Sequence, residues 1–285
     1  VRTARLEQVR QLPRRRTRQQ VQPRRPRLHV LPPQLRPTPP RPPPAPPTRR
    51  LTRCPLAAAA ARVPLVIVHG GGPEITSLSE RLAVGVEWHE GRRVTSPAAL
   101  DVAGMVLNGR INKRIVAALL NAGVDAVGLC GVDGGLLRAE VMENGALGRV
   151  GRVVHVRTAM LRSFIALGHT VVISPISVGV DGEPLNVNAD DAAAAVASAL
   201  GAAQLIFLTD VPGVRDRASF RSQLGADEAE LLVRDGVAAG GLGVKVSAGL
   251  RALSSGVYAV RIGSEHVLHD DAAGTLLTAV SAGVA

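Results

Sequence analysis

The chain has little cysteine, few aromatic residues and no long apolar run. Its two cysteines, Cys54 and Cys130, are too few for a disulfide framework and lack the clustered spacing of a zinc site. No apolar run approaches the roughly 20 residues that span a bilayer, which excludes a membrane helix. The N-terminus lacks the apolar core of a signal peptide, and its prolines prevent the amphipathic helix of a transit peptide. We therefore expect a cytoplasmic protein without a targeting signal.

Charge, proline and glycine are unevenly distributed along the 285 residues. Residues 1–62 contain no glycine, 14 of the 20 prolines, 16 of the 34 basic residues and one acidic residue, Glu7, a net charge of +15. The remaining 223 residues carry 18 basic and 22 acidic side chains, a net charge of −4. The proline-rich stretch 31–47 suits only polyproline or coil. We predict a disordered Arg/Pro-rich segment at 1–55, such as an out-of-frame reading would leave, and a folded domain at 56–285.

From Leu56 onward, apolar runs and segments with helical spacing of apolar residues alternate. This alternation is typical of parallel βαβ units, which bind ligands at the carboxyl ends of their strands. We predict an α/β fold, a three-layer αβα sandwich with a mostly parallel central sheet. The predicted strands are 65–68, 126–129, 170–174, 204–209 and 257–262, and the predicted helices are 97–121, 189–200 and 244–253.

A glycine loop follows the first of these strands. Gly70, Gly71 and Gly72 come directly after it, and Pro73 then suits the first turn of a helix. Glycine lets backbone N–H groups approach an anion closely, and the following helix N-terminus adds partial positive charge. The motif therefore predicts a phosphate-binding loop or, alternatively, a tight strand-to-helix turn, because it is neither a Walker A loop nor a GxGxxG fingerprint. We interpret His69 as the polar end of the strand.

A polar cluster precedes the alanine-rich helix predicted at 189–200. Asn186 and Asn188 lie two apart in an extended segment, so their side chains point the same way and could hold a polar substrate group together. The alternative is local: Asn188 or Asp190 would serve as an ordinary N-cap of the helix.

One of only two lysines in the chain, Lys245, follows Gly240, Gly241 and Gly243. The sequence places it just inside a helix, beside the positive end of the helix dipole. An ammonium group is poorly placed there, so an anionic partner is expected.

Taken in order, these motifs resemble the amino acid kinase family and, within it, the N-acetylglutamate kinases. The resemblance runs from about Leu56 to the C-terminus. Besides the three clusters, it rests on Arg93-Val94-Thr95, Asn112-Lys113, the AVGLCGVDGG stretch at 126–135, LTDVPGV at 208–214 and Gly274-Thr275.

The resemblance implies an enzyme that transfers a phosphoryl group from ATP to the side-chain carboxylate of N-acetyl-L-glutamate, in arginine biosynthesis. Magnesium would be held mainly through ATP oxygens, and a homodimer is implied. A carboxylate is already nucleophilic, so no general base is required.

The resemblance also implies roles for single residues. Arg93 would hold the α-carboxylate of the acceptor, and Asp210 would line the nucleotide side. Without the resemblance, Arg93 reads as part of a solvated turn and Asp210 as a turn residue before Pro212-Gly213. The other implied roles are phosphate binding by Gly70, Gly71 and Gly72, charge stabilisation by Lys245, orientation of the positive groups by Asp190, and acceptor binding by Asn186 and Asn188.

One family feature is missing. Family members open with a strand that carries a K-x-G-G loop, but this chain has no lysine before Lys113 and no glycine before Gly70. We therefore expect weak or absent activity and reduced stability of the chain as written. The alternatives are a kinase for carrier-bound aminoadipate, a non-catalytic relative, and a protein that binds acidic partners through its basic arm. Specific nucleic-acid recognition is not expected, because the arm has no aromatic residue for base stacking.

Overall fold

The computed structural model describes residues 54–279 except 86, 90 and 91. The predicted disordered segment at 1–55 therefore lies outside the described residues except for its last two. Of these, Pro55 is already helical, as the first residue of α1 (Pro55–Ala60). The boundary between 55 and 56 stays a prediction.

A three-stranded parallel sheet contains the first predicted strands. Its order is β1-β7-β4, formed by β1 (Val66–Val68), β7 (Thr170–Ser174) and β4 (Ala126–Cys130). All five residues of the central strand β7 are buried, as expected for a parallel strand covered on both faces. The three strands lie where the sequence predicts them, and the α/β class is confirmed.

A second sheet holds the C-terminal strands. Its order is β10-β12-β13-β11, with β10 (Gln204–Leu208), β12 (Ala259–Gly263), β13 (Thr275–Thr278) and β11 (Gln223–Gly225). Strands β10 and β12 are parallel, while β12 and β13 are antiparallel. The helices α7 (Ala226–Arg234) and α8 (Gly240–Ser254) pack on this sheet and share its apolar core.

Four short strands close on themselves as a small barrel, which the sequence does not predict. They are β5 (Leu137–Val141), β6 (Val150–Val156), β9 (Pro184–Val187) and β8 (Ile176–Gly179). The remaining short elements are the hairpin β2 (Glu87–His89) and β3 (Arg92–Val94), and the 3-10 turns η3 (Asp133–Gly135), η4 (Glu143–Gly145) and η5 (Glu265–Leu268). Strand β9 leads directly into the next helix, and the predicted site residues Asn188 and Asp190 lie at the start of that helix.

The predicted helix at 97–121 is continuous but contains a π-helical segment. It runs through α3 (Pro97–Gly104), the π-helix η2 (Met105–Ile111) and α4 (Asn112–Asn121). Ser96 caps its start by accepting a hydrogen bond from the amide of Ala99. Such π-helical segments are rare and often occur at functional sites.

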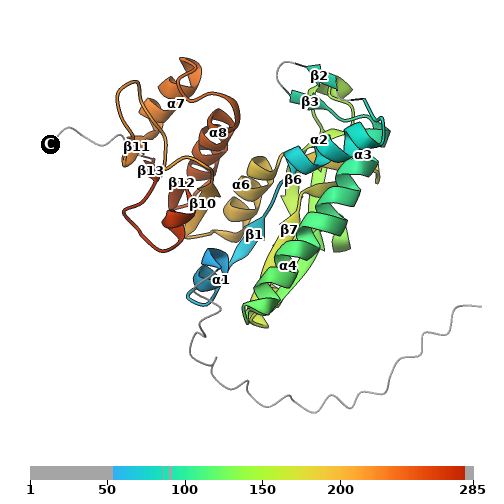
Figure 1. Cartoon of the computed structure of the whole chain (residues 1–285), viewed down its shortest axis with the longest axis horizontal. Coiled ribbons are helices and arrows are strands. Elements are labelled where there is room, and N and C mark those ends of the chain that lie inside the picture. Colours follow the sequence, from blue (N-terminus) through green and yellow to red (C-terminus); the bar gives the residue numbers. More distant parts are fainter. Residues whose placement is uncertain (1–53, 86, 90–91, 280–285) are drawn as a thin grey trace, which may run out of the picture. The chain divides into compact units, whose positions relative to one another are not determined.

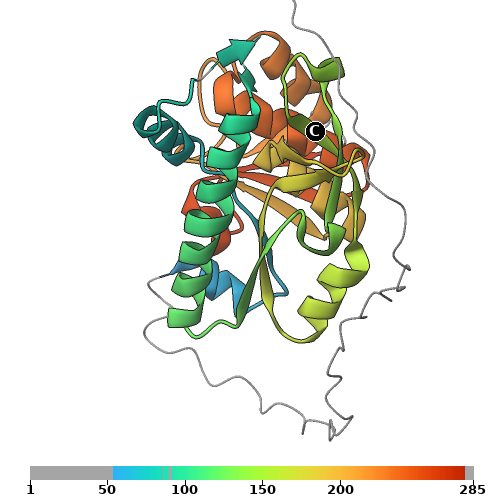
Figure 2. The ribbon, with the colours of Figure 1, turned by 90° about the vertical axis from the view of Figure 1, so that its right-hand side faces the viewer.

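The helix α6 (Ala189–Leu200) connects the two sheets. It packs against β1 of the first sheet and against β10 of the second, and also against α8 (Figures 1 and 2). Five of its first eight residues are alanine, which lets neighbouring backbones approach closely. The other helices are α2 (Gly72–Arg81) and α5 (Thr158–Ala166).

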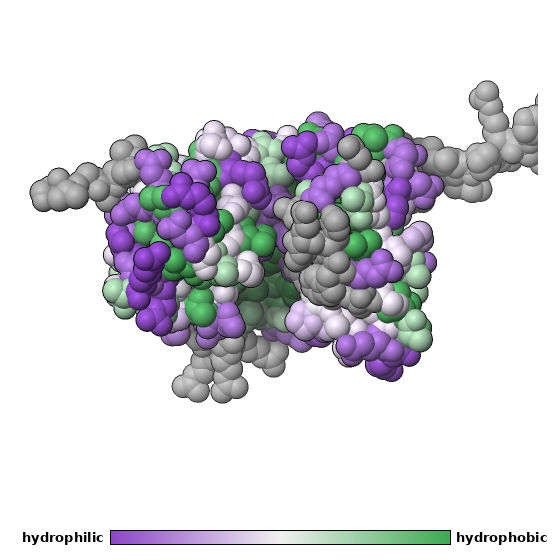
Figure 3. All heavy atoms as spheres, turned by 90° about the horizontal axis from the view of Figure 1, so that it is seen from above, coloured by the Kyte–Doolittle hydropathy of each residue, from purple (hydrophilic) through white to green (hydrophobic). Residues whose placement is uncertain are grey.

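From above, the described surface shows a hollow with a hydrophobic floor (Figure 3).

The glycine loop rests on the π-helix. A Cβ atom added to Gly71 would lie 2.3 Å from Cδ1 of Ile111 and 3.0 Å from Cδ2 of Leu107. Both partners are buried, so an added methyl group would have to displace side chains of the core. Around Gly72 no atom lies within 4 Å of an added Cβ. Close packing therefore requires glycine at 71 but not at 72.

We predict that Gly71→Ala lowers the free energy of unfolding by about 1–3 kcal/mol, the usual cost of an overpacked core. Gly72→Ala is the matched control and should change it by less than about 0.5 kcal/mol. Urea denaturation measures both. Equal midpoints for the two variants would contradict the packing described.

Candidate active site

The glycine loop and the start of α6 are in contact. A Cβ atom added to Gly70 would lie 3.4 Å from the Cβ of Ala189, the first residue of α6. The amides of Gly70, Gly71 and Gly72 make no hydrogen bond to another described residue. These donors are therefore free to bind an anion next to the start of α6.

Asn188 is the N-cap of α6. Its Oδ1 atom accepts hydrogen bonds from the amides of Asp190 and Asp191, at 2.8 and 3.2 Å. The side-chain oxygen of Asn188 thus acts as an ordinary N-cap, the alternative that the sequence leaves open. Its side-chain amide Nδ2 donates to no described residue, so it can still contact a ligand.

Asn186 joins the two motifs that the sequence treats separately. Its Nδ2 atom donates to Oγ1 of Thr95, 3.3 Å away, and Thr95 ends the Arg93-Val94-Thr95 motif. The flanking Leu185 and Val187 are buried, so Asn186 and Asn188 lie on the opposite face of the extended segment, as predicted.

Arg93 lies on β3, where its backbone pairs with Trp88. Its side chain lies outside the described residues. The acceptor-binding role of Arg93 therefore stays a prediction, and what the structure provides is the position of its strand next to Thr95.

Lys245 reaches α6 from α8. Its Nζ atom lies 3.0 and 3.1 Å from the two carboxylate oxygens of Asp190. The helix α8 begins at Gly240, so the glycines lie within its first turn and Lys245 lies in the second. The predicted helix start at 244 is wrong, because tertiary packing overrides the low helix propensity of glycine. The anionic partner expected for this lysine is Asp190.

The pair is shielded from water on both sides, with each side chain 19% exposed. Burial raises the pKa of the Asp190 carboxyl above its ordinary value, and the ammonium of Lys245 lowers it in part. Removing the lysine would therefore leave a carboxylate in surroundings that disfavour its charge.

Asp210 lies on the exposed loop after β10, where its Oδ1 atom accepts a hydrogen bond from Oγ1 of Thr209. The fully buried side chain of Thr275 fixes this loop: its hydroxyl accepts a hydrogen bond from the amide of Val214 and donates one to the carbonyl of Arg221. The structure thus brings Asp210 to an accessible place at the carboxyl end of its strand.

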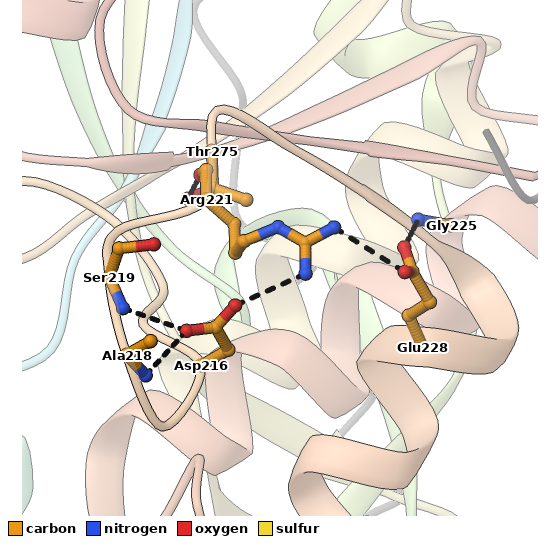
Figure 4. A network of polar contacts seen from close by, with 7 residues as sticks. All are labelled: Asp216, Ala218, Ser219, Arg221, Gly225, Glu228 and Thr275. Atoms are coloured by element: carbon orange, nitrogen blue, oxygen red, sulfur yellow. Dashed lines mark hydrogen bonds and ion pairs between the residues drawn. The ribbon is translucent and has the colours of Figure 1, made fainter. Parts of the chain in front are cut away.

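A polar network that the sequence analysis missed continues from this loop (Figure 4). The guanidinium of Arg221 lies between Asp216 and Glu228, at 3.2 and 3.4 Å. Hydrogen bonds from the amides of Ser219 and Ala218 lower the pKa of the Asp216 carboxyl, and Arg221 lowers it further. Glu228 also accepts from the amide of Gly225 at the start of α7. The network ties the loop to α7, and the sequence analysis does not predict this network.

Two further features carry no predicted site residue. A cavity of about 600 Å³ lies against the π-helix and is lined by Met105, Asn108, Lys113, Cys130 and Asp133, among others. His69, interpreted as a polar strand end, is buried beneath the glycine loop and contacts Asn112.

The model of the amino acid kinase family matches residues 49–264. The chain belongs to the amino acid kinase family. Among curated relatives, it is 46% identical over 198 residues to the acetylglutamate kinase of Geobacillus kaustophilus, covering 70% of this chain and 77% of the relative. It is 49% identical over 210 residues to the acetylglutamate kinase of Chloroflexus aurantiacus, covering 73% and 83%.

Two solved structures are similar in fold to this chain. A protein from Streptococcus mutans UA159 superposes with a TM-score of 0.71 at 28% identity, covering 81% of this chain and 91% of that one. An N-acetylglutamate synthase from Neisseria gonorrhoeae, complexed with coenzyme A and N-acetyl-glutamate, gives 0.67 at 25% identity, covering 79% and 55%. The prediction of a phosphotransferase is confirmed.

None of the helices in the described part of the chain has the length and apolar character that a membrane span requires.

We predict that Lys245→Met lowers the free energy of unfolding at pH 7 by about 1–3 kcal/mol, because a shielded carboxylate loses its hydrogen-bonded cation. When folding raises the pKa of a carboxyl group, the free energy of unfolding falls as the pH rises through that pKa. The variant raises the pKa of Asp190 further, so the loss should shrink as the pH falls. Chemical denaturation at several pH values measures it.

The matched control is Arg251→Met, which breaks the ion pair with Asp191 between the same two helices. Its arginine is 58% exposed, so the loss should stay below about 1 kcal/mol. A loss for Lys245→Met that is no larger than the control, or that does not depend on pH, would contradict the importance of the shielded pair.

Proposed function

We propose that this protein transfers the terminal phosphoryl group of ATP to the side-chain carboxylate of N-acetyl-L-glutamate, a step of arginine biosynthesis. The observation that carries the proposal is the contact of the glycine loop with the start of α6, whose Asp190 holds Lys245. Unpaired amides and a cation therefore lie at the two sides of one helix N-terminus. The names of the relatives at 46% and 49% identity support the acceptor.

The chemistry needs alignment and charge neutralisation more than proton transfer. A carboxylate oxygen attacks the γ-phosphorus, the bond to the β,γ-bridging oxygen breaks, and an acyl phosphate and ADP leave. The amides of Gly70, Gly71 and Gly72 would donate to the oxygens of the transferred group. Lys245 would neutralise charge on the phosphates, and Asp190 would hold the ammonium group of Lys245 in place.

The acceptor would bind through groups at the start of α6. The free Nδ2 of Asn188 and the Oδ1 of Asn186 supply a donor and an acceptor for an acetamido group and a carboxylate. Arg93 would hold the α-carboxylate through its planar guanidinium. Thr95 ties the strand of Arg93 to Asn186, so the two parts of the acceptor site come from one continuous scaffold.

The nucleotide would bind beside the second sheet. Asp210 would line this side, and the network around Arg221 would hold the Asp210 loop at a fixed place. Magnesium would enter with ATP, bound through the phosphate oxygens. We also propose that the working enzyme is a homodimer.

We predict that N-acetyl-L-glutamate binds more tightly than free glutamate, because neutral amides suit a blocked amine and the nearby carboxylate of Asp190 is already paired with Lys245. N-acetylaspartate, one methylene shorter, should bind more weakly by about tenfold. Isothermal titration measures all three without requiring turnover.

The outcomes separate the alternatives. Equal or stronger binding of glutamate would remove the proposed acceptor. Preferred binding of N-acetyl-2-aminoadipate would favour a kinase for carrier-bound aminoadipate. Acceptor binding without any ATP binding would favour a non-catalytic relative. Binding of acidic partners through the basic arm involves residues outside those described.

Where the structure describes the chain, the proposed phosphate cradle lacks the lysine of the K-x-G-G loop that the family resemblance leads us to expect. Among the described residues, β1 pairs with β7 on one side and with no strand on the other, and β10 is likewise an edge strand. Both strands pack on α6. We propose that a K-x-G-G strand belongs between them and that turnover is low without it.

We therefore predict that restoring a K-x-G-G strand and its helix ahead of Leu56 raises turnover by about 10²–10³-fold, the usual effect of one preorganised charge or donor. Acyl phosphate trapped with hydroxylamine measures the product of both proteins. Comparable turnover would show that residues 1–55 already supply the missing cation.

A further inference from the structure

The buried side chain of Asn112 connects strands β4 and β7 with His69, the residue before the glycine loop. It lies at the start of α4 and is 1% exposed. Its Nδ2 atom lies 3.0 Å from the carbonyl oxygen of Val172 on β7 and 3.3 Å from that of Leu129 on β4. The same nitrogen lies 3.3 Å from Nε2 of His69. One amide thus joins a helix, two strands and the loop.

These partners determine which way the amide points. Two carbonyl oxygens surround Nδ2, so that atom must be the donor. Oδ1 in turn lies 3.2 Å from the ammonium of Lys113, which also donates to the carbonyl of Gly128. Reversing the amide would set an oxygen against two oxygens. Gly128 makes room for the amide, because an added Cβ there would lie 2.0 Å from Oδ1 of Asn112.

The amide in turn determines the state of His69. The NH2 group of Asn112 cannot accept a hydrogen bond, so its contact with Nε2 of His69 is favourable only when Nε2 is the acceptor. This geometry favours the tautomer with the ring proton on Nδ1. The Nδ1–H group then donates to the carbonyl oxygen of Gly70, 3.1 Å away. Burial lowers the pKa of the His69 ring, which favours the neutral ring over the protonated one.

The carbonyl of Gly70 belongs to the peptide unit that carries the amide of Gly71. In a trans peptide the C=O and N–H groups point in opposite directions, and the described chain contains no cis peptide. Holding the Gly70 carbonyl against the buried ring therefore turns the Gly71 N–H away from it. The His69 amide, bonded to Ile173 on β7, anchors the other side of the ring.

We propose that Asn112 and His69 are positioning residues that aim the Gly71 amide at the transferred phosphoryl group. The assignment of that ligand rests on the proposed function, whereas the hydrogen-bond chain does not. His69 acts as a donor of fixed tautomer and exchanges no proton with substrate.

The first test measures the tautomer of His69 in the ligand-free protein by ¹³C and ¹⁵N NMR of the imidazole. We expect the proton on Nδ1. A proton on Nε2 would overturn the proposal whatever the protein phosphorylates, because the donor to Gly70 would then be absent.

The second test compares two variants that each keep half of the ring's hydrogen bonding. His69→Asn places an amide where Nδ1 stands and can still donate to Gly70, whereas His69→Gln places one where Nε2 stands and cannot. We expect the Kd for MgATP to rise about tenfold in His69→Gln and by less than about threefold in His69→Asn. The Kd for N-acetyl-L-glutamate should change little in both.

His155, exposed on β6, supplies the control His155→Gln, which should leave both constants unchanged. Equal Kd values for the two His69 variants would overturn the proposal. If the unaltered protein binds no MgATP, the proposed function fails instead. The Gly71 amide signal then decides, because it should shift in His69→Gln and stay in place in His69→Asn.

Discussion

The ion pair between Lys245 and Asp190 joins α8 to α6, the helix that lies between the two sheets. Helix α8 packs on the C-terminal sheet, and α6 packs on both sheets, so the pair sits where the two halves of the site meet. Because both side chains are shielded, each charge depends on the other for compensation. The same pair holds a cation at the start of α6, the helix end that the glycine loop also approaches. In the proposed function, one interaction would therefore serve both stability and chemistry.

Small residues make this meeting possible. Gly70 lies against Ala189, and Gly71 lies against the π-helix, where a methyl group would collide with Ile111. Alanines along α6 let its backbone approach β1 and β10. The loop is therefore held by contact on two sides, and its unpaired amides keep one orientation without any side chain of their own.

Polar groups beneath the loop complete its support. The two N–H donors of the Asn112 amide are shared among the carbonyl oxygens of Leu129 on β4 and Val172 on β7 and Nε2 of His69, which holds the end of β1 against both strands. Near the loop that carries Asp210, Arg221 lies between Asp216 and Glu228, five and seven residues away. Asn112 therefore joins elements far apart in the sequence, whereas Arg221 joins near neighbours.

The sequence by itself determined the features that depend on near neighbours. Buried apolar runs located the parallel strands, helical spacing located α6, and the polar cluster limited its N-cap to Asn188 or Asp190, since each pattern reports contacts within a few residues. Tertiary structure decided the rest: α8 begins at Gly240, four short strands close into a barrel, Lys245 meets Asp190, and His69 meets Asn112. These last two pairs lie 55 and 43 residues apart, and a local pattern cannot encode a contact that only the packing of whole elements creates.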